Sequence, residues 1–191
     1  MSVLFAFVAT LLTTSPAMAQ NEEPALPEVR FVTTEGSFVL QLRPDVAPKT
    51  VENFLAYVNS GFYDGTIFHR VIPGFMVQAG GFDENLGRKQ TRAPIVNEAT
   101  STLPNLRGTI AMARTNAPDS ATSQFFINVA NNDFLNAGVR GPGYAVFGKV
   151  TEGMGVIDRI AGVQTGYQRG MADVPVSPVI IESAEEITKD N

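Results

Sequence analysis

Residues 68–80 read FHRVIPGFMVQAG and form the most informative stretch of the chain. Two short apolar runs, 66–72 and 75–79, meet at Pro73-Gly74, a dipeptide typical of turns. Because side chains alternate along a strand, Met76 and Gln78 share one face of the second run. Arg70 lies in the first run, which otherwise belongs in a core, and burying an unpaired charge is costly. Arg70 therefore serves either a structural ion pair or the chemistry of a site.

Six further apolar runs of strand length lie outward from this segment, most of them bounded by Gly, Pro, Asn or Asp. The alternating run 37–43 follows 29–34 across Glu35-Gly36, which is the pattern of a β-hairpin. The other four runs comprise residues 108–113, 124–129, 144–150 and 179–187. Apolar residues three and four positions apart predict two helices, at 48–60 and 152–161.

Eight short strands with only two helices do not fit an alternating βαβ fold, which needs a helix after nearly every strand. An antiparallel sandwich or barrel is left. A closed barrel would remove the exposed edges that such short strands leave in an open sheet. Residues 80–107 carry no strand pattern and are predicted to form a long surface loop, a kind of loop that is often functional.

The composition is that of one globular domain. Of the 191 residues, 44% are hydrophobic and 17% are charged, which is enough apolar surface for a folded core. The net charge of −5 argues against a nucleic-acid partner. Cysteine is absent and His69 is the one histidine, which excludes disulfides, thiolate nucleophiles and metal sites with two imidazoles. We expect neither a metal nor a cofactor.

The first 19 residues have the pattern of a signal peptide. Residues 3–12 are apolar except for Thr10, and Ala17-Met18-Ala19 is a small-x-small cleavage site, although no Lys or Arg precedes the apolar run. A run of this length is too short to span a bilayer, which needs about 20 residues. We expect cleavage after Ala19, an exposed lead-in over 20–28, a single domain over 29–191 and no membrane attachment of the mature chain.

Nucleophilic catalysis is an alternative, because Ser120, Thr122 and Ser123 lie close together beside a carboxylate. A serine hydrolase also needs a base at the hydroxyl, and the sequence offers only His69. No G-x-S-x-G motif precedes a helix pattern. Strand alternation turns His69 away from the face of Arg70, so a packed core histidine is the favoured interpretation.

Four segments in this order and spacing resemble the cyclophilin-type peptidyl-prolyl isomerases, most closely their exported bacterial branch. They read FHRVIPGFMVQAG at 68–80, RGTIAMAR at 107–114, DSATSQFFI at 119–127 and YAVFGKV at 144–150. The resemblance covers about residues 29–187. It implies a mainly β fold, a closed eight-stranded antiparallel barrel capped by two α-helices.

The resemblance also implies the residues of the site. Arg70 matches the catalytic arginine of the family, and Gln78 would orient it. The positions matching the proline pocket and catalytic face are Phe75, Met76, Gln124 and Phe126, with Phe134 and Leu135 closing the pocket. The segment Ala113, Arg114 and Thr115 matches the one whose backbone pairs with bound peptide.

Three positions depart from the common family pattern. Many members carry Trp where this chain has Phe134, and that indole donates a hydrogen bond to cyclosporin; phenylalanine has no donor, so we expect weak cyclosporin binding. Tyr144 stands where many members have His, which keeps an aromatic wall but changes its polarity. Arg114 replaces a common Asn at a position that acts mainly through its backbone.

The activity implied is rotation about Xaa-Pro bonds, whose barrier of about 18–20 kcal/mol comes from amide conjugation. A guanidinium aimed at the proline nitrogen would bind the twisted state better than either planar isomer. The expected partners are proline-containing peptides and unfolded exported proteins. We expect the protein to be a monomer and to act in the periplasm. The alternative is a chaperone or scaffold that binds proline segments with incidental turnover.

Overall fold

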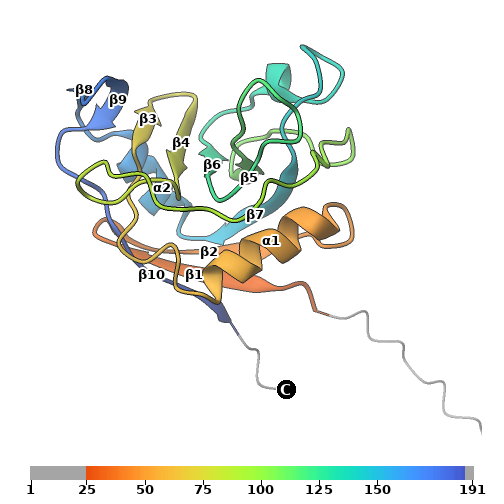
Figure 1. Cartoon of the computed structure of the whole chain (residues 1–191), viewed down its shortest axis with the longest axis horizontal. Coiled ribbons are helices and arrows are strands. Elements are labelled where there is room, and N and C mark those ends of the chain that lie inside the picture. The colour runs from red at the N-terminus through yellow and green to blue at the C-terminus, as the bar shows by residue number, and fades with distance from the viewer. Residues whose placement is uncertain (1–24, 188–191) are drawn as a thin grey trace, which may run out of the picture.

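The computed structural model describes residues 25–187 (Figure 1). The predicted signal peptide at 1–19 and most of the lead-in at 20–28 lie outside the described residues. The first strand begins at Glu28, one residue before the predicted start of the domain.

Eight antiparallel strands form one curled sheet, and each corresponds to a predicted run. In order across the sheet they are β10 (Ile181–Ile187), β1 (Glu28–Thr33), β2 (Gly36–Leu42), β7 (Val146–Glu152), β5 (Thr109–Met112), β6 (Phe125–Asn128), β4 (Met76–Ala79) and β3 (Arg70–Ile72). Most of these strands are shorter than the predicted runs. The prediction of a mainly β, antiparallel fold with two helices is confirmed.

The prediction of a closed barrel is wrong. The sheet is a half-barrel whose edge strands, β10 and β3, share no hydrogen-bonded ladder. The segment before β3 and the segment before β10 are joined by an isolated bridge between Ile67 and Ile180. Next to it, the N–H of Phe68 donates a hydrogen bond of 3.0 Å to Val179 O. The two edges therefore touch at this bridge and do not form a continuous ladder.

Two helices pack against the inside of the curl (Figure 1). Helix α1 (Pro48–Val58) begins at a proline, whose missing N–H costs nothing in the first turn, and buries Phe54 completely. Helix α2 (Met154–Ala161) follows Gly153, which has φ +79° and on which a Cβ would lie 2.5 Å from Ser37 O. Glycine at this position lets α2 approach β2 closely.

The strands bury side chains on both faces, and this produces two separate clusters. The inner cluster is the main core and contains a group of aromatic rings: Phe31, Phe54, Tyr63, Phe125 and Phe147. The smaller outer cluster contains Met76, Ala111, Phe126 and Val146. Phe125 and Phe126 are neighbours in β6 and therefore belong to different clusters. The outer cluster forms the floor of the site described below.

One hairpin of the structure was not predicted from the sequence. Strands β8 (Thr165–Gln168) and β9 (Met171–Pro175) form a separate two-stranded sheet that contacts β3. Arg169 and Gly170 make its turn with φ of 45° and 84°. These strands do not form an apolar run of strand length, which is the pattern that predicted the other eight.

The long connection between β4 and β5 agrees with the prediction of a surface loop. Residues 80–107 wrap the surface with isolated bridges and no strand of their own, as predicted. The short 3₁₀ helix η1 (Asp133–Leu135) lies beside the outer cluster. Across residues 25–187 the structure has no helix with the length and apolarity needed to cross a membrane.

Candidate active site

Four neighbouring strands carry a continuous row of side chains on the outer face of the sheet. The register pairs Arg70 of β3 with Gln78 of β4, and Gln78 with Phe126 of β6. Phe126 is paired in turn with Ala111 of β5. Met76 lies two residues from Gln78 and shares its face. Strand register alone thus brings a guanidinium, an amide and an apolar floor side by side.

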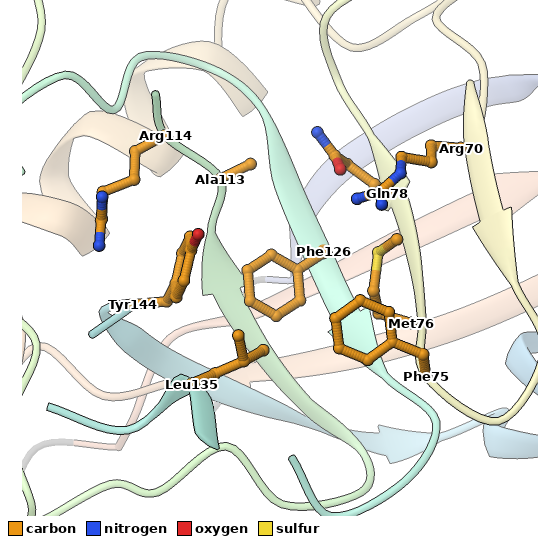
Figure 2. Close-up of a pocket in the computed structure, with 9 residues that line it drawn as sticks. All are labelled: Arg70, Phe75, Met76, Gln78, Ala113, Arg114, Phe126, Leu135 and Tyr144. Carbon is orange, nitrogen blue, oxygen red and sulfur yellow. The ribbon is translucent and has the colours of Figure 1, made fainter. Parts of the chain in front are cut away.

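A pocket of about 120 Å³ opens above this row (Figure 2). Its lining consists of Arg70, Phe75, Met76, Gln78, Ala113, Arg114, Phe126, Leu135 and Tyr144. The floor is dry, because Met76 and Phe126 are 2% and 4% exposed. Figure 2 shows Arg70 and Gln78 on one side of the pocket and Tyr144 and Arg114 on the other.

Nine of the twelve predicted site residues line this pocket, and the other three lie around it. Phe134 does not line it; its ring is 38% exposed and stacks on Phe75 at a centroid distance of 5.6 Å. Phe134 therefore supports the pocket wall from behind. Thr115 and Gln124 line an adjoining groove of about 330 Å³.

The groove continues from the pocket through shared residues, Gln78, Ala113 and Arg114. At their junction the amide of Gln78 donates a hydrogen bond of 2.9 Å to Oε1 of Gln124. A Cβ at Gly81 would lie 2.6 Å from the Gln124 side chain, so only glycine at this position allows the backbone to approach that amide so closely. The two glutamines are thus held together between pocket and groove.

The backbone beside the pocket has free hydrogen-bonding groups. Ala113 N–H donates to Gln124 O at 3.0 Å, and Thr115 N–H donates to Oγ of Ser120 at 2.9 Å. Between them, the N–H and C=O of Arg114 have no hydrogen-bond partner among residues 25–187. An extended peptide can pair with such an edge. The side chain of Arg114 is occupied, since it donates to Gly143 O at 2.9 and 3.1 Å and lies 4.4 Å over the ring of Tyr144.

Arg70 is not buried, contrary to the interpretation of its apolar run. Its side chain is 44% exposed, and Nε lies 3.8 Å from Oδ2 of Asp173 in the β8–β9 hairpin. The amide of Gln78 bonds to Gln124, and no side-chain hydrogen bond joins Gln78 to Arg70 in the described part of the chain. The partner that the structure gives Arg70 is therefore Asp173, which the sequence analysis missed because the hairpin itself was not predicted.

The geometry rules against a serine hydrolase. Ser123 is fully buried and its hydroxyl donates to Gly80 O at 2.7 Å, while Ser120 Oγ donates to Ala117 O. His69 is 4% exposed and packs on Phe82 at 4.6 Å, and its Nδ1 has no hydrogen-bond partner in the described chain. Burial lowers the pKa of His69 to about 4. His69 is therefore a core residue that stays neutral and contacts neither serine.

No group of three or more His, Cys, Asp or Glu side chains within residues 25–187 is arranged to hold a metal ion. The groups available for chemistry at this site are two guanidinium groups, amides, backbone groups and apolar surface.

Comparison with known proteins assigns this arrangement to a family. The family model described as cyclophilin type peptidyl-prolyl cis-trans isomerase/CLD matches residues 28–186. Peptidyl-prolyl cis-trans isomerase cyp18 of Streptomyces antibioticus is 61% identical over 160 residues, which are 82% of this chain and 96% of that protein. Peptidyl-prolyl cis-trans isomerase A of Dickeya dadantii is 54% identical over 182 residues, or 95% of this chain and 94% of that protein.

A solved structure agrees with the sequence relatives. The crystal structure of a cyclophilin type isomerase of Cryptosporidium parvum in the presence of the dipeptide Ala-Pro aligns with a TM-score of 0.71 at 27% identity. The alignment covers 85% of this chain and 99% of that one. With the fold, the family model and close relatives in agreement, the chain belongs to the cyclophilin family of peptidyl-prolyl cis-trans isomerases.

Proposed function

We propose that Arg70 is the catalytic residue. The pocket would bind the prolyl ring of the substrate, and the guanidinium of Arg70 would face the nitrogen of that proline. The observation that carries this proposal is the position of the Arg70 guanidinium at the rim of a pocket with an apolar floor, on a row of four neighbouring strands. A guanidinium is a fixed donor at every relevant pH, which suits a reaction that requires no titrating group.

The geometry supports a reaction without covalent intermediates. Met76 and Phe126 would hold the pyrrolidine ring by apolar contact, while the free backbone groups of Arg114 hold the peptide strand. With the ring fixed, the carbonyl before the proline swings through the twisted state. In that state the lone pair of the proline nitrogen is localised, and a donor from Arg70 binds it more tightly than it binds a planar amide.

Gln78 and Gln124 would serve as binding groups beside this centre. Their mutual hydrogen bond of 2.9 Å fixes both amides at the entrance to the groove. Amide donors that this bond does not use would be available to carbonyl groups of the peptide.

The experiment is exchange NMR on an Xaa-Pro peptide with the wild-type chain, Arg70→Ala and Arg70→Lys. We expect Arg70→Ala to lower kcat by about 10²- to 10³-fold, the effect of removing one preorganised transition-state donor. Arg70→Lys keeps the charge without the planar fork and should recover only part of the rate. Arg30→Ala, which removes an exposed arginine of β1, is the control.

A proline-binding chaperone is the competing function. It would show peptide-induced chemical shifts in the wild type without faster exchange, and Arg70→Ala would change neither. Faster exchange that is lost in a folded Arg70→Ala protein supports the isomerase mechanism and contradicts the chaperone.

We further propose that the protein is exported to the periplasm and assists the folding of newly translocated chains there as a monomer. The apolar run 3–12 followed by Ala17-Met18-Ala19 supports export. Uncatalysed Xaa-Pro isomerisation takes tens to hundreds of seconds, so folding chains benefit from a catalyst. Mass spectrometry of the mature chain from a periplasmic extract should find Gln20 at its N-terminus, and light scattering should give the monomer mass. Recovery of the full-length chain from the cytosol would contradict export.

A further inference from the structure

A second depression of about 320 Å³ adjoins the pocket on the side of Leu135 and Tyr144. It shares those two residues and Arg114 with the proline pocket. Figure 2 places these three side chains opposite Arg70 and Gln78. A peptide that leaves the proline pocket away from the groove therefore passes over this depression.

The depression is lined by two arginines and no carboxylate. Arg140 forms no ion pair within residues 25–187 and lies 5.2 Å over the ring of Phe134. The hydrogen bonds of Arg114 all go to backbone carbonyls, which carry no formal charge. Both positive charges therefore stay uncompensated, although the whole chain has a net charge of −5.

An ordered loop presents Arg140. Across the loop, Gly138 N–H donates to Gly141 O at 2.9 Å and Val139 N–H donates to Asn136 O at 3.2 Å. A Cβ at Gly143 would lie 2.4 Å from Ala137 N, so the two ends of the loop touch. Arg140 is thus displayed at the tip of a closed loop beside the pocket.

An amide completes the set of donors. Oδ1 of Asn136 accepts from Asn105 N at 2.7 Å and from Asn105 Nδ2 at 3.1 Å. These bonds fix the amide and leave its NH₂ group without an acceptor in the described chain. The lining thus offers hydrogen-bond donors and positive charge to whatever enters the depression.

We propose that this depression is a subsite for a carboxylate side chain close to the proline of the substrate. The inference rests on the proposed use of the adjoining pocket by the prolyl ring. Because consecutive Cα atoms are about 3.8 Å apart, a wall shared by the two cavities places the carboxylate on the residue immediately before or after the proline. A Glu or Asp side chain there would accept hydrogen bonds from these donors, whereas a Lys side chain would be repelled by the positive charges of Arg114 and Arg140.

The test measures kcat/KM by exchange NMR on end-blocked peptides that place Glu, Gln or Lys immediately before or immediately after the proline. Blocked termini leave the side chain as the sole carboxylate. In one of the two positions we expect Glu to be turned over about three- to fivefold faster than Gln at low salt, as for a partly exposed ion pair, and Lys to be slower than Gln. The preference for Glu should shrink at high salt.

Variants of Arg140 separate charge from packing. Arg140→Gln should bring the Glu/Gln ratio to about one, Arg140→Lys should keep most of it, and Arg140→Glu should favour the Lys peptide. Arg30→Gln makes the same charge change on β1 and should leave the ratio as in the wild type.

Equal rates for Glu and Gln in both positions would overturn the subsite, as would a wild-type ratio that survives Arg140→Gln. If Arg30→Gln removed the preference for Glu over Gln to the same extent, the preference would come from the long-range electrostatic field of the molecule. That result would also overturn the subsite. Turnover of the Gln peptides tests the proposed function separately, because it does not depend on the subsite.

Discussion

Phe134 is an aromatic ring without a hydrogen-bond donor, at the edge of the pocket. It stacks on Phe75 and so supports the wall through contact alone. We expect cyclosporin to inhibit this protein weakly. Phe134→Trp should lower the inhibitor concentration needed for half-inhibition by up to about tenfold, the effect of one added hydrogen bond. An inhibition series with both proteins checks this, and tight inhibition of the wild type would refute it.

His69 is unusual because it is buried with an unpartnered nitrogen at Nδ1. Burial disfavours the imidazolium form, and this is the main cause that lowers the pKa of His69 to about 4. In the unfolded chain its pKa is about 6.5. Between these two values the unfolded chain binds a proton that the folded protein does not bind.

The stability of the protein should therefore fall as the pH falls below 6.5. By linkage, His69 lowers the free energy of unfolding by about 2 kcal/mol between pH 7 and pH 5. Urea denaturation at both pH values measures the loss, and His69→Leu should abolish most of it. If wild type and variant lose the same stability, a different group controls this pH range.

At the scale of elements, the β8–β9 hairpin has a defined role. Its strand β9 contacts β3 and carries Asp173 with φ of 62°, a left-handed conformation that Asp and Asn tolerate better than most residues. That conformation places the carboxylate 3.8 Å from Nε of Arg70. The hairpin therefore acts as a positioning element for the guanidinium.

Asp173→Asn tests this role, because asparagine keeps the backbone conformation and removes the charge. Since the pair is half-exposed, we expect kcat to fall by only about two- to fivefold, with little change in KM or thermal stability. High salt should lower the wild-type rate towards that of the variant. A fall in stability with unchanged kcat would show that Asp173 matters only for the fold.

At the scale of the whole molecule, the sheet separates stability from function by its two faces. Phe125 is fully buried in the inner aromatic core, where its ring lies 5.4 Å from Tyr63 and 5.7 Å from Phe54. Phe126, the next residue, belongs to the outer cluster and lines the pocket. One strand thus contributes to the core and to the site in alternate positions.

The matched variants Phe125→Leu and Phe126→Leu should therefore differ in kind. We expect Phe125→Leu to lower the free energy of unfolding by about 1–2 kcal/mol while the folded protein keeps its turnover. Phe126→Leu should raise KM, because the prolyl ring loses its aromatic floor. Denaturation curves and isomerase assays of both proteins check the difference, and equal effects on activity would contradict the separation of the two faces.

The order of apolar runs determined most of the secondary structure of this protein. Short apolar runs bounded by turn residues predicted all eight strands of the main sheet, and three- and four-residue spacing predicted both helices. Three of the nine predicted residues that line the pocket, Arg70, Met76 and Gln78, lie in two strands joined by a short turn, so the local sequence accounts for their proximity. Local patterns carry this information because the spacing of side chains along a strand or helix is fixed.

Only the tertiary structure decided which groups face Arg70, and whether the sheet closes. Asp173 lies far from Arg70 in the sequence and reaches it through a hairpin without apolar alternation. Arg140 and Arg114 line one depression because the loop closes at Gly143. The sheet stays open because its edge strands share no ladder and the chain segments before them meet at an isolated bridge. Such contacts join distant segments, and no spacing within a single segment encodes them.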